Sequence, residues 1–349
     1  MSEVSPEQRA DAPLSSLGAY TTLRLGGPAG TLTVATEPDE ALATVRNASA
    51  AGESVLILAG GSNVVIGDAG FAGHVVLLRT RGIRPIAQDD DSVTLRVAAG
   101  EVWDDFVART VRDGLSGVEC LSGIPGSAGA TPIQNVGAYG QEVAHTIVAV
   151  HAYDRDADAV VTLTAEECGF GYRSSVFKYS DRRLVLEVDF RLTRGTGSEP
   201  IRYAELARQL GVEAGDRVPL EQARETVLKL RAGKGMVLDP DDRDTWSVGS
   251  FFTNPVVDRL PEPNMPHWPA PGGRVKLPAA WLIEQAGFTK GFGVGDGVRI
   301  SAKHTLALTN RGTGTTAELL ELARVIRAGV RDRFGIELHP EPVLIACEL

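Results

Sequence analysis

The chain has 349 residues, of which 43% are hydrophobic and 23% charged, a composition typical of a globular protein with material for two or three domains. Its formal net charge of −10 is opposite to the basic surface that nucleic-acid binding needs. No apolar run approaches the roughly 20 residues of a membrane span. The polar start MSEVSPEQRADAP lacks the apolar core of a signal peptide. The three cysteines are far apart and form no CxxC pair, so we expect no metal site, no disulfide framework and a cytoplasmic protein.

Short β-like runs alternate with helical patterns in the first half of the chain. The predicted strands cover residues 32–35, 54–59, 74–78 and 94–98, and the predicted helices cover residues 39–51 and 102–115. Three more strand-like runs, IVAVHAYD, AVVTLT and LVLEVDFRL, follow between residues 147 and 192. This order favours an α+β layout, in which helices pack on mixed sheets, over a series of regular βαβ units.

The second half begins with a predicted helix at residues 220–230, and a Pro-rich stretch at 260–273 then indicates an ordered excursion from the core. The clearest helix lies near the end. Thr315 and Glu318 form a capping box, an apolar face follows, and Gly335 closes the helix. The run VLIA at residues 343–346 is strand-like.

Two glycine-rich segments suggest a bound dinucleotide. Gly60 and Gly61 follow the apolar strand VLILA, where paired glycines allow backbone N–H groups to form an anion-binding nest; a plain hairpin turn is the alternative. The second segment, residues 123–140, is long for a loop inside a compact domain, which indicates function, although an Ω-loop packed on itself is possible. Together the segments predict a pyrophosphate held by backbone amides.

A third glycine motif competes with this interpretation. Residues 312–317 read GTGTTA, follow a predicted strand at 305–309 and open the C-terminal helix, as the GxGxxA fingerprint of a Rossmann unit does. A Rossmann unit needs several more parallel strands after this point, and the sequence ends at Leu349. We therefore favour a helix N-terminus in which glycine serves a tight turn.

Three polar residues stand in settings that suit catalysis or anion binding. Arg173 lies among aromatic residues in GFGYRSSVFK, which suits a carboxylate or phosphate in a partly dry pocket; a surface hairpin is the alternative. Ser250 lies between a glycine and two phenylalanines without a GxSxG elbow, so a proton donor or structural hydroxyl fits better than a hydrolase nucleophile. Glu341 stands just ahead of a predicted strand, where a capping or surface acid is the plain alternative.

Five motifs carry a resemblance to a known family. LAGGSNVVIGDAGFAG, GIPGSAGATPIQNVGAYG, YRSSVFK, GSFFTNPVV and VKLPAAWLIEQAG occur in this order. Together they resemble the UDP-N-acetylenolpyruvoylglucosamine reductases (MurB), in the longer, type I-like variant, over nearly the whole chain. The resemblance implies an α+β fold: a two-subdomain FAD-binding region of the vanillyl-alcohol-oxidase (PCMH) type and a C-terminal α+β substrate-binding domain. We expect a flexible tail at 1–18, FAD subdomains at 19–79 (completed by 336–349) and 80–215, and the substrate domain at 216–335.

The resemblance also implies an FAD-dependent oxidoreductase of peptidoglycan (cell wall) precursor synthesis. NADPH would reduce the flavin and leave, and UDP-N-acetylglucosamine enolpyruvate would then take hydride from flavin N5 at its terminal vinyl carbon, giving UDP-N-acetylmuramate. Ser250 would protonate the resulting enol, and Arg173 and Glu341 are the other catalytic residues that the family pattern assigns. Negative charge develops toward the substrate carboxylate, and fixed cationic groups stabilise it.

Binding residues follow from the same resemblance. The expected FAD contacts are Gly60, Gly61, Ser62, Asn63, Val64, Pro125, Gly126, Ser127, Gly129, Ala130 and Gly137, and the expected substrate contacts are Tyr139, Arg173, Tyr203, Lys234, Asn254 and His304. Val343 departs from the family by occupying the position of an expected arginine, so a positive charge there is missing or comes from Lys303, His304 or another group. The main alternative is a flavin-dependent oxidase of the same fold that acts on another alcohol or sugar; a flavin-binding sensor without turnover is the second.

Overall fold

The computed structural model describes residues 16–349, which form two compact, interleaved parts of the chain. Unit 1 comprises Met1–Ala29, as far as it is described, Gly61–Phe71 and Leu238–Leu349; unit 2 comprises Gly30–Gly60 and Ala72–Val237. Residues 1–15 of the predicted tail lie outside the described residues, whereas Leu17 begins the 3-10 helix η2 (Leu17–Tyr20) and is fully buried. The domain limits expected from the sequence follow a different division and stay a prediction.

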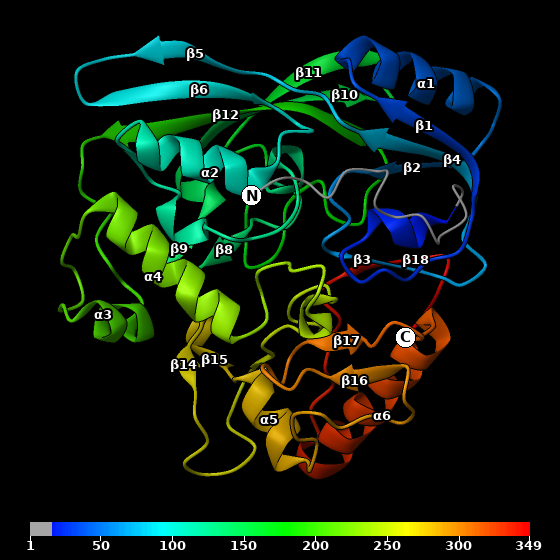
Figure 1. The fold of residues 1–349 in the computed structure, drawn as a ribbon, viewed down its shortest axis with the longest axis vertical. Helices are drawn as coiled ribbons and strands as arrows, with labels where there is room; N and C mark the ends of the chain where they lie inside the picture. The colour runs from blue at the N-terminus through cyan, green and yellow to red at the C-terminus, as the bar shows by residue number, and fades with distance from the viewer. Residues whose placement is uncertain (1–15) are drawn as a thin grey trace. The chain divides into compact units, whose positions relative to one another are not determined.

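An antiparallel sheet with the strand order β11-β10-β12-β6-β5 is the centre of unit 2. Its strands are β5 (Ile83–Gln88), β6 (Ser92–Ala98), β10 (Ile147–Asp154), β11 (Ala159–Thr164) and β12 (Arg183–Arg194), and β7 (Leu115–Ser116) also pairs with β12. Helix α2 (Trp103–Arg112) lies along this sheet (Figure 1). The Trp103 and Phe106 rings pack on Phe190 of β12 with centroids 5.7 and 5.2 Å away. All three are fully buried and lie in the largest core.

Smaller elements complete unit 2. A three-stranded sheet in the order β1-β4-β2 consists of β1 (Ala29–Ala35), β4 (Phe71–Leu78) and β2 (Val55–Leu58), and helix α1 (Pro38–Ala50) joins β1 to β2. Helices α3 (Ala204–Leu210) and α4 (Leu220–Gly233) share a second core, and β8 (Gly137–Ala138) and β9 (Gln141–Glu142) form a short hairpin. The strands β2 and β4 run parallel, so antiparallel and parallel pairs both occur, as the α+β prediction requires.

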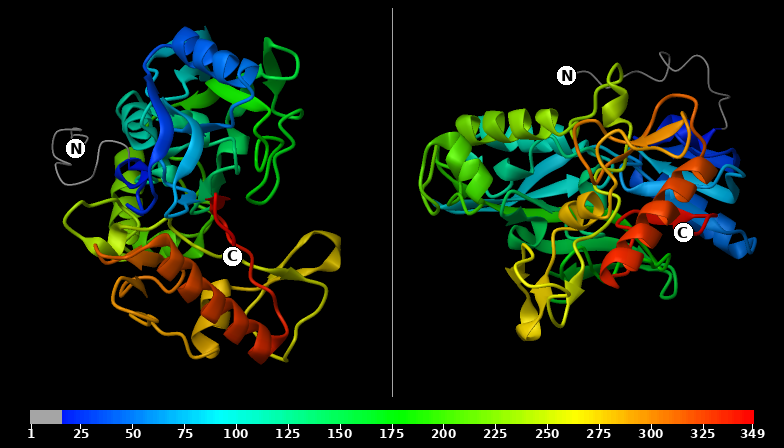
Figure 2. Two further views of the ribbon diagram at one scale, coloured as in Figure 1. Left: turned by 90° about the vertical axis from the view of Figure 1, so that its right-hand side faces the viewer. Right: turned by 90° about the horizontal axis from the view of Figure 1, so that it is seen from below.

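Unit 1 combines short strands with the two C-terminal helices around one core. The strands β3 (Val64–Ile66) and β18 (Val343–Ile345) pair in parallel, and β16 (Val298–Ile300) and β17 (Leu308–Asn310) pair antiparallel. Helices α5 (Ala279–Gln285) and α6 (Thr316–Phe334) bury their apolar faces in this core. A small sheet in the order β13 (Val256–Val257), β15 (Val275–Lys276) and β14 (Trp268–Pro269) protrudes from these helices in both views of Figure 2. The predicted Pro-rich excursion, residues 260–273, supplies the strand β14 of this sheet and most of the loop that leads to it.

The elements predicted in the first half are confirmed, with ends that differ by a few residues. The C-terminal helix α6 begins with the predicted Thr315–Glu318 capping box and ends at Gly335, whose φ is +69°. The sequence patterns do not predict β5 or α5. The strand β5 is a mostly exposed edge strand containing Pro85, so it lacks an alternating pattern. The seven residues of α5 are too few to establish a helical period.

Candidate functional site

Ser250 lies in unit 1 on an extended segment that is held from both sides. It forms a bridge with Ala307, and the Phe251 N–H donates to the Leu306 carbonyl at 2.7 Å. On the other side, the Glu341 N–H donates to the Phe251 carbonyl at 2.8 Å. Phe251 is fully buried, whereas Ser250 is half-buried. Main-chain pairing therefore fixes the backbone at Ser250 while the residue itself stays partly accessible.

The segment that carries Glu341 also contacts the first glycine-rich segment. Phe252 forms a bridge with Pro340, and the Val343 N–H donates to the Asn63 carbonyl at 3.0 Å as β18 begins its pairing with β3. The Asn63 side-chain amide lies 3.5 Å from the Glu341 carbonyl oxygen. Three segments that the sequence singled out separately, around the serine, the glutamate and the asparagine, are thus neighbours in unit 1.

Gly61 opens the part of the glycine-rich segment that belongs to unit 1. Its φ is +59°, and a Cβ at this position would lie 2.1 Å from the Tyr20 carbonyl oxygen, so only glycine fits. The Thr22 N–H donates to the Gly61 carbonyl at 3.1 Å. The hairpin alternative is wrong, because β2 pairs with β4 and β3 pairs with β18. The predicted FAD contacts that follow, Ser62, Asn63 and Val64, are all half-buried.

In unit 2 the second glycine-rich segment approaches Gly60 backbone to backbone. A Cβ on Gly60 would lie 2.4 Å from the Cα of Gly126, and a Cβ on Gly129 would lie 2.4 Å from the Cβ of Ala99. The segment is pinned by main-chain bonds, among them Gly129 N–H to the Ala99 carbonyl at 2.9 Å. Pro125, Ala130 and Gly137 lie in the same segment. Small residues are therefore required here for close packing of the backbone.

Ser127 carries the strongest local sign that this segment binds a ligand. Its hydroxyl oxygen is buried and has no hydrogen-bond partner among residues 16–349. A buried hydroxyl without a partner is unfavourable, so a polar group of a ligand would complete its bonding. Together with the closely packed glycines, this hydroxyl fits the pyrophosphate of FAD.

Arg173 is placed by the same glycine-rich segment. Its guanidinium donates to the Gly137 carbonyl at 2.7 Å and to the Asn135 carbonyl at 3.4 Å, and its backbone φ is +52°. The Lys178 ammonium donates to the Arg173 carbonyl at 3.1 Å. The motif YRSSVFK therefore folds back on the segment 123–140. Gly171 and Ser174 do pair across a tight turn, as the hairpin alternative expects, but Arg173 is half-buried and bonded within the protein, so its charge is not simply solvated.

Asn135 is a positioning residue that the sequence interpretation did not single out. It is buried with a φ of +48°, and its side chain donates to Glu142 at 2.8 Å and to the Gly171 carbonyl at 3.1 Å. Its side-chain oxygen accepts from the Ala144 N–H at 3.1 Å. Asparagine is among the few residues that tolerate a positive φ, so its place in the glycine-rich segment was an available signal.

The predicted substrate contacts of unit 2 form one cluster. The Tyr139 and Tyr203 rings meet edge to face with centroids 5.4 Å apart, and the Lys234 ammonium lies 5.9 Å from the Tyr139 ring centroid. Lys234 also pairs with Glu205 at 2.7 Å. Burial, the largest single influence, would lower the pKa of Lys234, but the hydrogen bond to Glu205 together with the charge interactions with Tyr139, Glu205 and Tyr203 raises it. Burial raises the pKa of Tyr139. Lys234 is therefore cationic at neutral pH.

The remaining predicted contacts lie in unit 1. Asn254 is half-buried, and its side-chain oxygen accepts a hydrogen bond from the Ala279 N–H at 2.9 Å at the start of α5. The oxygen of this side-chain amide is therefore already bonded within the protein. His304 is half-buried. Lys303, considered above as a substitute for the missing arginine, donates to Asp242 and this hydrogen bond lowers the pKa of Asp242. Its charge is thus already paired within the protein.

The GTGTTA motif is not a dinucleotide site. The Asn310 side-chain oxygen accepts from the Gly312 and Gly314 N–H groups at 2.9 and 3.1 Å. At the start of α6, the Asp68 carboxylate accepts from the Thr316 N–H at 2.8 Å and from the next N–H at 2.9 Å. The protein itself thus fills the place of a phosphate, and the preceding strand pairs only antiparallel, which excludes a Rossmann unit.

Two other classes of site are not found within residues 16–349. None of the helices in this range is both long and apolar enough to cross a membrane. The same range holds no cluster of three or more His, Cys, Asp or Glu side chains suited to a metal. Cys120, Cys168 and Cys347 are free thiols, and burial raises the pKa of Cys168 to about 11, which makes this thiol unreactive.

Comparisons with known proteins agree with this geometry. The family described as "UDP-N-acetylenolpyruvoylglucosamine reductase, C-terminal domain" matches residues 239–345, and the family described as "FAD binding domain" matches residues 29–163. The chain is 59% identical to the UDP-N-acetylenolpyruvoylglucosamine reductase of Salinispora arenicola, with 100% of each chain covered. It is 51% identical to the protein of that name from Mycolicibacterium smegmatis, with 95% of each covered.

A solved structure extends the likeness to the fold. The crystal structure of UDP-N-acetylenolpyruvylglucosamine reductase (MurB) from Thermus caldophilus matches with a TM-score of 0.65 and 25% identity. The match covers 95% of this chain and 97% of that one. The predicted fold class, an FAD-binding region of the PCMH type with a C-terminal α+β domain, is thereby confirmed. The chain belongs to the UDP-N-acetylenolpyruvoylglucosamine reductase (MurB) family of FAD-dependent oxidoreductases.

Proposed function

We propose that this chain reduces UDP-N-acetylglucosamine enolpyruvate to UDP-N-acetylmuramate at the expense of NADPH, within peptidoglycan precursor synthesis. Sequence identity of 59% and 51% over 100% and 95% of the chain to proteins named UDP-N-acetylenolpyruvoylglucosamine reductase supports the substrate class. The observation that carries the proposal is the meeting in unit 1 of the Ser250, Glu341 and Asn63 segments. A cytoplasmic location and NADPH, rather than NADH, as reductant are parts of the same proposal.

Ser250 is the proton donor in this proposal. FAD, when bound, would supply the hydride chemistry that links NADPH to the terminal carbon of the enolpyruvyl group. The adjacent carbon takes its proton from the Ser250 hydroxyl, so each turnover consumes NADPH and one proton and adds two hydrogens across the double bond. A hydroxyl is a weak acid, and it can serve because the enolic intermediate is strongly basic. The paired backbone on both sides of Ser250 keeps the donor in place without a change of conformation during the reaction.

Arg173 and Glu341 support the proton transfer. The Arg173 guanidinium, already anchored on the Gly137 carbonyl, is a fixed positive charge for the substrate carboxylate, toward which negative charge moves. The Glu341 N–H donates to the carbonyl of Phe251, the residue that follows Ser250. The Glu341 carboxylate would orient the Ser250 hydroxyl or assist proton delivery.

Residues from both glycine-rich segments would hold FAD. In unit 2 these are Gly60, Gly126 and Ser127, whose buried hydroxyl lacks a hydrogen-bond partner within the described part of the chain. In unit 1 they are the residues after Gly61. Tyr139, Tyr203 and Lys234 would bind the nucleotide part of the substrate, where a cationic lysine beside two aromatic rings suits a diphosphate and a base.

The experiment is anaerobic mixing of the purified, FAD-loaded protein. NADPH should bleach the yellow flavin, and UDP-N-acetylglucosamine enolpyruvate should restore the colour with formation of UDP-N-acetylmuramate, identified by mass. A flavin that is bleached by a simple alcohol or sugar and not by NADPH would establish the oxidase alternative instead. Bound FAD that neither ligand reduces or reoxidises would indicate a sensor without turnover.

A further inference from the structure

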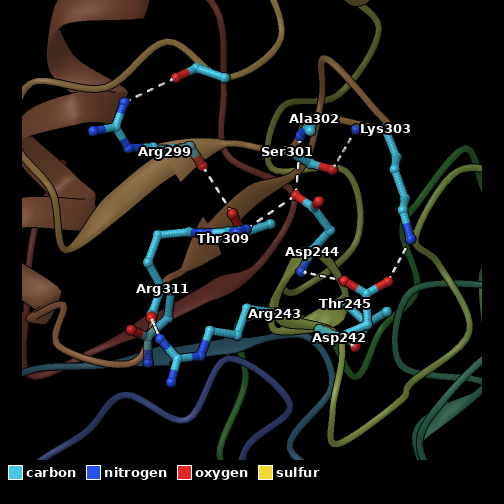
Figure 3. A network of polar contacts seen from close by, with 12 residues as sticks. Asp242, Arg243, Asp244, Thr245, Arg299, Ser301, Ala302, Lys303, Thr309 and Arg311 are labelled. Carbon is cyan, nitrogen blue, oxygen red and sulfur yellow. Dashed lines mark hydrogen bonds and ion pairs between the residues drawn. The ribbon is translucent and has the colours of Figure 1, made fainter.

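A polar network in unit 1 joins the chain just ahead of Ser250 to the turn that pairs with it (Figure 3). The first partner is the 3-10 helix η6 (Arg243–Thr245), which precedes Ser250 by only a few residues. The second is the turn at residues 301–307, which contains the bridge partner of Ser250. Figure 3 shows the Asp244 carboxylate directed at the Ala302 main chain and the Asp242 carboxylate directed at the Lys303 ammonium.

Asp244 is the centre of this network. Its Oδ1 accepts from the Ala302 N–H at 3.0 Å and from the Arg311 guanidinium at 3.1 Å. The residue is only 8% exposed. Its N–H donates to Asp242, which caps η6 and pairs with Lys303. A carboxylate in a nearly dry place with a cationic partner makes strong, directional hydrogen bonds, so Asp244 ties its own segment to both flanks of the turn.

The turn transmits this anchoring to the bridge. Buried Ser301 donates its N–H to the Ala307 carbonyl at 2.8 Å, and its hydroxyl oxygen accepts from the Lys303 N–H at 3.0 Å. The Ala307 N–H donates to the His304 carbonyl at 3.1 Å. The turn is therefore closed on itself, and Ala307 cannot shift relative to Ala302 without loss of these bonds.

The contacts form a closed ring. The chain runs from Asp244 to Ser250, crosses by the bridge to Ala307, returns through the turn to Ala302, and closes on the Asp244 carboxylate. We propose that Asp244 is a positioning residue that sets the place of the Ser250 hydroxyl for proton donation. This inference rests on the proposed role of Ser250 as proton donor.

Asparagine at this position tests the charge without changing the size. The Asp244 Oδ1 accepts both bonds, so the amide oxygen of Asp244→Asn can accept them only as weaker, uncharged hydrogen bonds, and the ion pair with Arg311 is lost. A shift of a reacting group by about 1 Å can slow a reaction by roughly 10²-fold. We therefore expect reoxidation of the reduced flavin by the enolpyruvyl substrate to slow by about 10- to 100-fold, with flavin reduction by NADPH unchanged.

The experiment compares Asp244→Asn with Ser250→Ala and with the double variant in anaerobic stopped-flow measurements of both half-reactions. Asp296→Asn is the matched control, because it removes an exposed ion pair with Arg299 at the edge of the same network. It should leave both rates unchanged. Arg311→Gln removes the ion pair with Asp244 from the other side, and it replaces Asp244→Asn in the experiment if that variant does not fold. In the double variant, Asp244→Asn should add little to the effect of Ser250→Ala, because the group it positions is absent.

Three results would overturn the inference. Equal slowing of both half-reactions by Asp244→Asn would show a general structural role. Additive effects in the double variant would show that Asp244 acts independently of Ser250, and wild-type reoxidation rates in both Asp244→Asn and Arg311→Gln would show no role. Each of these leaves the proposed function standing if Ser250→Ala alone slows reoxidation. A Ser250→Ala protein with wild-type reoxidation would overturn the proposed role of Ser250 as proton donor together with the inference, while reduction of the enolpyruvyl substrate would still stand.

Discussion

The two segments that we propose to be catalytic are placed by different kinds of contact. In unit 1, the backbone at Ser250 is fixed by main-chain bonds to Leu306 and Glu341, so its position depends on the fold and little on the side chain at 250. In unit 2, the Arg173 guanidinium is placed by its own hydrogen bonds to the carbonyls of a glycine-rich segment. A substitution should therefore remove chemistry at Ser250 while leaving the backbone intact, whereas at Arg173 it removes chemistry and local order together.

A large effect that follows from this difference is expected at Arg173. In Arg173→Ala the developing negative charge loses a fixed positive partner, and such losses cost about 10²- to 10³-fold in rate. Lysine keeps the charge but lacks the planar fork that reaches the Gly137 and Asn135 carbonyls, so Arg173→Lys should recover only a small part. The measurement is steady-state kcat/KM for the enolpyruvyl substrate. Full activity of the lysine variant would show that charge alone, without anchoring, is sufficient.

The stability of the sheet in unit 2 should also depend on hydrogen bonds between charged side chains, as the placement of Arg173 does. Asp189 on β12 is buried and accepts bonds from Arg96 on β6 at 2.7 and 2.8 Å, with His151 on β10 at 2.9 Å. Burial alone would raise the pKa of Asp189, but the hydrogen bonds from Arg96 and His151 outweigh it and lower the pKa to about 2. The depressed pKa means that the carboxylate stabilises the fold above its unfolded pKa of 3.8 and that this contribution is lost as pH falls toward 2.

Asp189→Asn should therefore reduce the free energy of unfolding by about 2 kcal/mol at neutral pH. The difference from the wild-type protein should stay constant above about pH 5 and shrink as pH falls from about 4 to 2. Chemical denaturation across this pH range measures it. Asp181→Asn, which removes an exposed partner of Arg155, is the control and should be nearly neutral. A difference that does not change with pH would contradict the linkage to this carboxyl.

A smaller effect, on the affinity for FAD, is expected where the two glycine-rich segments of unit 2 pack backbone against backbone. A Cβ added by Gly60→Ala would lie 2.4 Å from the Cα of Gly126 and push the two glycine-rich segments apart. We expect the Kd for FAD to rise by about tenfold, since overpacking typically costs 1–3 kcal/mol, roughly. Gly233→Ala at the end of α4 meets nothing within 4 Å and is the control. Titration of the apoprotein with FAD measures both, and equal affinities would show that this close approach is irrelevant to the flavin.

Much of the site could be predicted from the sequence because its motifs lie in short continuous stretches. Ser250, Arg173 and the glycine-rich segments each have a local pattern, and the family resemblance connects them. What local patterns cannot supply is the pairing of distant segments. The Glu341 N–H reaches back to Phe251, and Asp68 caps a helix that begins at Thr316; both contacts depend on the completed fold.

The same limit explains the residues that the sequence interpretation missed. Asp244 and Asn135 are ordinary polar residues until the chain segments that they connect are known. The GTGTTA motif is the opposite case: its local pattern matches a dinucleotide-binding fingerprint, but the structure shows no such site. Its amide groups already donate to Asn310 and Asp68. A motif for anion binding is informative only when its donors are still available to a ligand.

Single-turnover reoxidation of the reduced Ser250→Ala protein tests the role of Ser250 most directly. Ser180→Ala, at an exposed surface position, is the control. Proton donation by Ser250 predicts normal flavin reduction by NADPH in both variants, and reoxidation by UDP-N-acetylglucosamine enolpyruvate that is slower by about 10²- to 10⁴-fold only in Ser250→Ala. Reoxidation of Ser250→Ala at the wild-type rate would show that the proton comes from another group.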